Sequence, residues 1–86
     1  MNESEILEAV KKALNISGDY QNDTLQIYVD VTIQFMINAG IPEDKVRSSS
    51  CVGILARGVN DLWIYGEGAT FSNAFVMLVS QLALKG

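Results

Sequence analysis

The sequence contains no histidine, a single cysteine and a single proline among its 86 residues. A lone cysteine, Cys51, cannot form an internal disulfide. Without histidine or a second thiol, the chain also lacks the usual ligands of a zinc site. Histidine is the commonest general acid or base in enzymes. We therefore expect no disulfide, no metal centre and no enzymatic activity.

Other sources of catalysis are weak in this sequence. Cys51 falls near the start of a predicted helix, which favours a reactive thiolate, but buried cysteine more often serves as a small apolar filler. We favour the structural interpretation. Gly66 and Gly68 do not form a phosphate-binding loop, because the further glycine, the lysine and the preceding strand of such motifs are missing.

Basic residues are few, six against ten acidic ones, which gives a net charge of −4. They are scattered along the chain, whereas nucleic-acid-binding proteins usually carry a basic patch or stripe. The longest uncharged run, Gly68 to Leu84, is shorter than the roughly 20 apolar residues of a spanning helix. The first five residues include two glutamates and no basic residue, where a secretory signal is basic. These features favour a protein of the cytoplasm, or one assembled there.

Apolar residues are abundant, at 49% of the chain with a mean hydropathy of +0.21. A domain of this size buries only about 60–65% of the surface that its unfolded chain exposes. A contiguous apolar patch on a small domain usually marks a surface that binds a partner. With disulfides and metals excluded, we expect a single domain over residues 1–86 that is stabilised by oligomerisation.

Hydrophobic periodicity predicts a small all-α bundle of four helices and no strand. The first helix is predicted over Glu3–Leu14 and begins with a capping box of Asn2 and Glu5. The second is predicted over Thr24–Ala39, with a capping box of Asp23 and Gln26 at its start and Gly40 and Pro42 after its end.

The third helix is predicted over Ser48–Tyr65, after a possible short turn at Glu43–Val46. Gly53 and Gly58 lie inside it, and each costs about 1 kcal/mol relative to alanine. We interpret both as places where a neighbouring backbone approaches closely; the alternative is that the helix is shorter than predicted. The fourth helix is predicted over Asn73–Lys85, with Ser72 as its N-cap.

The second helix is unusual because its polar side chains form one narrow stripe: Gln26, Asp30, Gln34 and Asn38. Roughly three quarters of its circumference is apolar, more than a surface helix normally shows. We expect the chain alone to be unable to cover it.

Aromatic residues gather around the end of the third helix and the start of the fourth. Two interpretations are open: they pack the corner between these helices, or they anchor a neighbouring subunit, as Trp and Tyr often do. A second stripe on the last helix, which contains Met77 and Leu84, is expected to be half-exposed. The candidate interface residues are Ile27, Val31, Phe35, Trp63, Tyr65, Phe71, Met77 and Leu84.

The segment Gly58-Val-Asn-Asp-Leu-Trp-Ile-Tyr-Gly-Glu-Gly68, followed by Phe71-Ser-x-x-Phe75 and Val79-x-Gln-Leu-Ala83, carries a resemblance. It is similar to the C-terminal half of the head–tail connector (adaptor) proteins of tailed bacteriophages and their prophages. In that family a long helix ends in a stretch similar to Val59-Asn-Asp-Leu-Trp-x-Tyr65, a loop containing glycine follows, and the last helix begins at serine. The N-terminal half is similar in layout only.

The resemblance implies a helical protomer that forms a homo-oligomeric ring, typically a dodecamer, below the portal vertex of the capsid. It implies the portal protein and a stopper or tail-completion protein as partners, a position in the virion neck, and assembly in the host cytoplasm. DNA is expected to pass through the ring without sequence-specific binding. The family is neither enzymatic nor dependent on a cofactor, and no motif assigns individual residues to a partner.

Two alternatives belong to other classes. A small DNA-binding regulator with a helix-turn-helix would also be helical, but it would bind DNA in a salt-sensitive way. An acyl-carrier-like protein would be small, acidic and four-helical, and it carries Asp-Ser-Leu at the start of its second helix. The matching residues here are Asp23-Thr24-Leu25, and threonine is not the residue that holds the prosthetic arm.

Overall fold

The computed structural model describes residues 1–65 and 70–85, and of Tyr65 only the backbone. Within these residues the chain is helical and contains no strand, which confirms the predicted all-α bundle. The elements are α1 (Glu3–Ala13), α2 (Asn22–Asn38), α3 (Glu43–Val46), the 3-10 turn η1 (Ser49–Cys51), α4 (Val52–Tyr65) and α5 (Asn73–Lys85).

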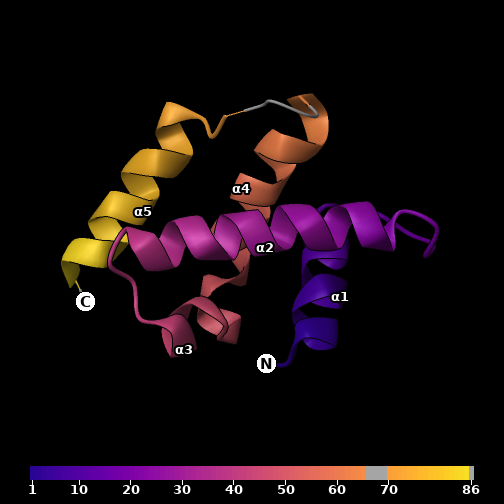
Figure 1. The fold of residues 1–86 in the computed structure, drawn as a ribbon, viewed down its shortest axis with the longest axis horizontal. Helices are drawn as coiled ribbons and strands as arrows, with labels where there is room; N and C mark the ends of the chain where they lie inside the picture. The colour runs from indigo at the N-terminus through magenta and orange to yellow at the C-terminus, as the bar shows by residue number, and fades with distance from the viewer. Residues whose placement is uncertain (66–69, 86) are drawn as a thin grey trace.

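Helix α4 is the centre of the fold (Figure 1). It packs against α1, α2 and α5, and α2 crosses it at a steep angle. Helices α1 and α5 lie on opposite sides of this crossing. One apolar core joins the four long helices and α3, and its most deeply buried side chains include Ile6, Val10, Leu25, Val29, Met36, Ile41, Val46, Leu55, Val59, Phe75 and Val79.

The first helix begins as predicted. Asn2 Oδ1 accepts from the Glu5 backbone N–H at 2.8 Å, and Glu5 Oε1 accepts from the Asn2 N–H at 2.9 Å. The helix ends at Ala13, one residue before the predicted end. These two bonds confirm the capping box. It could be predicted from the sequence because each bond joins groups only three residues apart.

The predicted start of the second helix is wrong. Helix α2 begins at Asn22, its N-cap is Gln21, and no side chain caps it, so the expected box of Asp23 and Gln26 is absent. Gln26 Nε2 instead donates to Asp30 Oδ1 at 2.9 Å. The preceding loop is held by the amine of Lys11, which also binds the Asn22 side chain. This tertiary contact places the chain in helical conformation earlier than the local sequence indicates.

The end of α2 follows the prediction. Gly40 has a φ of 110°, a conformation that glycine adopts readily. Its N–H donates to the Ile37 carbonyl at 3.0 Å, and the Ile41 N–H donates to the Met36 carbonyl at 3.2 Å. These two bonds make a Schellman motif. Met36 and Ile41 are both buried, so the apolar contact that accompanies this motif is part of the core.

The short turn at Glu43–Val46 is confirmed as α3, but the predicted continuous helix from Ser48 is wrong. The chain forms the 3-10 turn η1 first, and α4 begins at Val52. Ser48 Oγ donates to the Lys45 carbonyl at 2.6 Å and shares a hydrogen bond with Ser50 Oγ. Serine hydroxyls that bind nearby backbone compete with helix formation, which explains the delayed start.

The two glycines of α4 have different surroundings. A Cβ on Gly58 would lie 2.6 Å from Phe75 Cζ and 2.7 Å from Thr32 Cγ2. The predicted close approach is therefore confirmed at Gly58, although side chains rather than backbone make it. At Gly53 nothing lies within 4 Å, so the same prediction is wrong there.

Helix α5 has the predicted bounds, Asn73–Lys85. Ser72 Oγ accepts from the Phe75 N–H at 3.2 Å, as an N-cap does. The Ser72 N–H donates to Asp61 Oδ2 at 3.0 Å. Because Asp61 belongs to α4, this bond ties the start of the last helix to the central one.

Candidate interaction surfaces

Of the seven candidate interface residues whose side chains the structure describes, four are exposed. The exposed fractions are 60% for Ile27, 47% for Val31, 62% for Met77 and 88% for Leu84. The first two lie on α2 and the other two on α5. The structure therefore presents two separate apolar surfaces, one on each of these helices.

The outer face of α2, defined here as Ile27, Val31, Gln34 and Asn38, follows one helical stripe. Residues at this spacing share one side of a helix, and all four are exposed. The buried residues of α2 lie on the opposite side and face the core: Leu25, Val29, Thr32, Ile33 and Met36. The outer face thus points away from the protein interior.

Side-chain hydrogen bonds run along the polar part of α2. Gln26 donates to Asp30, and Gln34 Nε2 donates to Asn38 Oδ1 at 3.0 Å. These bonds join residues four apart, as the predicted polar stripe requires. The charged residues of α2 are Asp23 and Asp30, and the helix contains no lysine or arginine. The outer face therefore has an acidic border.

The chain covers more of the apolar surface of α2 than the sequence analysis predicts. Helices α1 and α4 bury one side of it, and Phe35 is half-buried rather than free. The ring of Phe35 lies 4.8 Å from that of Phe71 and 5.9 Å from that of Phe75, measured between centroids. What remains apolar and exposed on α2 is the pair Ile27 and Val31.

The aromatic residues do not all meet at one corner. Trp63 packs edge-on against Tyr28 of α2, with ring centroids 6.2 Å apart. Phe71 lies in the phenylalanine cluster, 4.8 Å from Phe75. Both are half-buried within their own chain, which supports packing over anchoring a neighbour. The side chain of Tyr65 lies outside the described residues.

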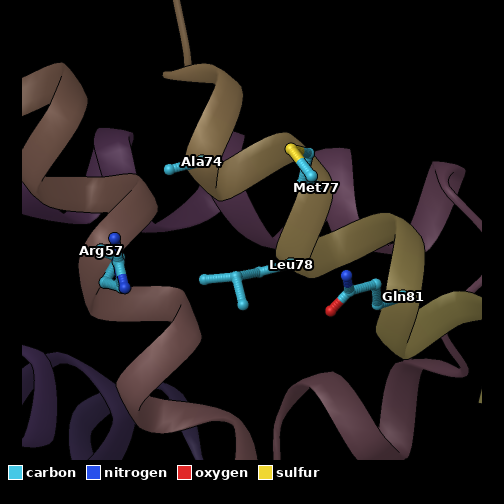
Figure 2. A pocket seen from close by; sticks show the side chains of 5 residues that line it. All are labelled: Arg57, Ala74, Met77, Leu78 and Gln81. Atoms are coloured by element: carbon cyan, nitrogen blue, oxygen red, sulfur yellow. The ribbon is translucent and has the colours of Figure 1, made fainter.

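A shallow apolar groove runs between α4 and α5 (Figure 2). Two adjoining hollows of about 290 and 180 Å³ form it, and they share Leu78 and Gln81. Leu78 points from α5 toward α4, with Arg57 opposite it. We call this surface the α4–α5 groove. It is lined by Ile54 and Arg57 from α4 and by Ala74, Met77, Leu78, Gln81, Leu82 and Lys85 from α5.

The border of the groove is basic. Arg57 lies at one hollow and Lys85 at the other, and within residues 1–65 and 70–85 no acidic side chain lines either of them. Asp61 of α4 instead accepts the hydrogen bond from Ser72. Sequence reasoning found Met77 but missed the groove, because a groove forms only when two helices lie side by side.

A buried lysine was also missed. Lys11 is 3% exposed, and its Nζ donates to the Gly18 carbonyl at 2.6 Å, to Asp19 Oδ1 at 3.1 Å and to Asn22 Oδ1 at 2.8 Å. The hydrogen bond from Lys11, its positive charge and a hydrogen bond from Asn22 lower the pKa of Asp19, in that order of size. The sequence held a signal, because Lys11 falls between Leu7 and Leu14 on the apolar stripe of α1.

Cys51 is 1% exposed and lies in η1 rather than in the first turn of α4. This burial supports a structural role for the thiol. Within residues 1–65 and 70–85, no three His, Cys, Asp or Glu side chains gather so as to hold a metal ion. None of the helices in this part of the chain is long and apolar enough to cross a membrane.

Among the described residues, the candidate interface residues thus point to two surfaces, the acidic-bordered outer face of α2 and the basic-bordered α4–α5 groove. Met77 lines this groove, and Leu84 does not. Comparison of the chain with protein-family models, with curated proteins and with solved structures finds no match in any of the three.

Proposed function

We propose that this protein is a structural assembly protein whose copies associate into a closed ring, as its resemblance to head–tail connectors implies. The supporting observation is the presence of two different exposed apolar surfaces, Ile27 and Val31 on α2 and Met77 and Leu84 on α5. Contiguous exposed apolar groups on a small domain mark surfaces that bind partners.

The difference between the two surfaces supports a ring more than a two-fold dimer. A two-fold interface uses the same patch on both subunits, whereas a head-to-tail contact joins two different patches. Repeated head-to-tail contacts produce a ring when the rotation closes. A protomer with one apolar surface on α2 and a different one on α5 carries the two patches that a head-to-tail contact joins.

In this proposal the ring, a dodecamer by resemblance, lies in the virion neck between the portal and a stopper or tail-completion protein. DNA passes through its channel. The net charge of −4 is compatible with this passage, because affinity for DNA phosphates comes mainly from lysine and arginine. The protein has no catalytic step in this role.

The test combines self-association with partner binding. Light scattering over a wide concentration range and negative-stain electron microscopy are done on the protein alone and with the portal protein encoded in the same gene cluster. We expect association that increases with concentration, and rings on the portal. A monomer under all conditions that does not bind this portal contradicts the proposal, as does tight, sequence-dependent DNA binding in gel shifts at low salt.

A further inference from the structure

We propose that the α4–α5 groove receives the outer face of α2 from a second copy of this chain. The proposal rests on the ring assembly proposed above and names the two surfaces that meet in it. Four observations support it: the open shape of the groove, its length, its charge and its position on the protomer.

The open shape of the groove favours side chains as its occupant. Its two hollows, of about 290 and 180 Å³, lie next to each other along the surface, whereas sites for small molecules and cofactors enclose most of the ligand. The lining is largely apolar, with Ile54, Leu78 and Leu82 along its length. Protruding aliphatic side chains such as Ile27 and Val31 match this lining.

The length of the groove is sufficient as well. Ile27 and Val31 lie four residues apart on α2, about 6 Å at 1.5 Å per residue. The α5 wall of the groove extends from Ala74 to Lys85, eleven residue steps or about 16 Å. The groove can therefore receive both side chains, and insertion of the apolar stripe of a helix into a groove is a common mode of recognition.

The charges are complementary. Asp23 and Asp30 are the charged residues of α2, and Arg57 and Lys85 are the charged residues that line the groove. Exposed ion pairs contribute little to affinity, but complementary borders select the partner and fix the register of the contact. The apolar contact supplies affinity, and the charges orient it.

The two surfaces lie on opposite sides of the protomer. In Figure 1, α2 crosses in front of α4. In Figure 2, which looks into the groove, α2 passes behind α4 and α5. A contact between one copy's α2 and the next copy's groove leaves one surface of each kind free at the two ends. Further copies can add to both ends until the assembly closes.

Disulfide trapping tests the pairing directly. The background is Cys51→Ala, which removes the native thiol. In it, Ile27→Cys and Met77→Cys are made separately and mixed under mild oxidation. We expect a crosslinked dimer from the mixture, none from either variant alone, and a ladder of oligomers when both changes are in one chain.

The matched control replaces Val76, the neighbour of Met77 on α5. Val76 is exposed but does not line the groove. A Val76→Cys variant mixed with Ile27→Cys should not crosslink. Equal crosslinking with both partners, or crosslinking of Ile27→Cys with itself, overturns the proposed pairing.

Charge reversal provides a second readout. Asp30→Arg and Arg57→Glu should each weaken self-association by about fivefold, and the double variant should recover most of the loss. Circular dichroism checks that each variant is folded. Rings that form normally but show neither the crosslink nor the charge effect refute this interface and leave the proposed function intact. Absence of any assembly, with or without the portal, refutes both.

Discussion

The ring of Phe75 occupies the space into which a side chain at position 58 would extend. A Cβ on Gly58 would lie 2.6 Å from Phe75 Cζ, closer than non-bonded carbon atoms approach. Phe75 and Thr32, the other neighbour, are both fully buried and cannot move aside without displacing the core. The absence of a side chain on α4 thus lets α2 and α5 pack against it.

The two glycines of α4 should consequently respond in opposite ways to alanine. Gly58→Ala should lower the free energy of unfolding by about 1–3 kcal/mol through overpacking, despite the better helix propensity of alanine. In Gly53→Ala the new methyl group extends into open space, so this change should raise the free energy of unfolding by up to about 1 kcal/mol. Urea denaturation followed by circular dichroism measures both, and equal effects of the two changes would contradict the structure.

The amine of Lys11 joins α1 to the loop before α2. Lys11→Met keeps the length of the side chain but removes three hydrogen bonds, so it should lower the free energy of unfolding by about 2 kcal/mol. Lys12→Met is the control, because Lys12 is exposed and should change stability by no more than about 0.5 kcal/mol. If both variants unfold at the same urea concentration, the buried lysine contributes no stability.

Acidification should weaken the same contact. The pKa of Asp19 is lowered in the folded protein, mainly by its hydrogen bond from Lys11. Its carboxylate therefore stabilises the fold above the unfolded-state pKa of about 3.9, and this stabilisation is lost as the pH falls through the folded-state pKa. An NMR titration should find the Asp19 pKa below the usual value in the wild type and near it in Lys11→Met. An unchanged pKa in that variant would exclude Lys11 as the cause.

Phe35 and Met77, both candidate interface residues, should separate folding from assembly. Phe35 packs against Phe71 and Phe75, so Phe35→Asp should destabilise the monomer by about 3 kcal/mol or more. Met77 is 62% exposed, so Met77→Glu should change monomer stability by no more than about 0.5 kcal/mol while it impairs self-association. Thermal unfolding and light scattering measure the two effects. A Met77→Glu variant that assembles like the wild type would remove Met77 from the interface.

Local features of the fold were predictable from the sequence. The Asn2 cap, the Gly40 end of α2, and the Ser72 cap with the bounds of α5 all depend on groups a few residues apart. The all-α class follows from apolar periodicity in the same way. The start of α2 was mispredicted because Lys11, eleven residues before Asn22, holds the loop.

The surfaces were only partly predictable. The sequence indicated that Ile27, Val31, Met77 and Leu84 are candidates for exposure, and the structure leaves these four uncovered. It could not show that Phe35 and Phe71 contact each other, because that contact depends on where the chain before α5 lies relative to α2.

The sequence by itself determined that the chain is helical, where α1 begins, where α2 ends, and the bounds of α5. Only the tertiary structure decided which apolar side chains remain exposed, which glycine is in close contact, and that α4 and α5 form a groove. The physical reason is range: caps and periodicity act within a few residues, whereas burial depends on which helices the fold brings together.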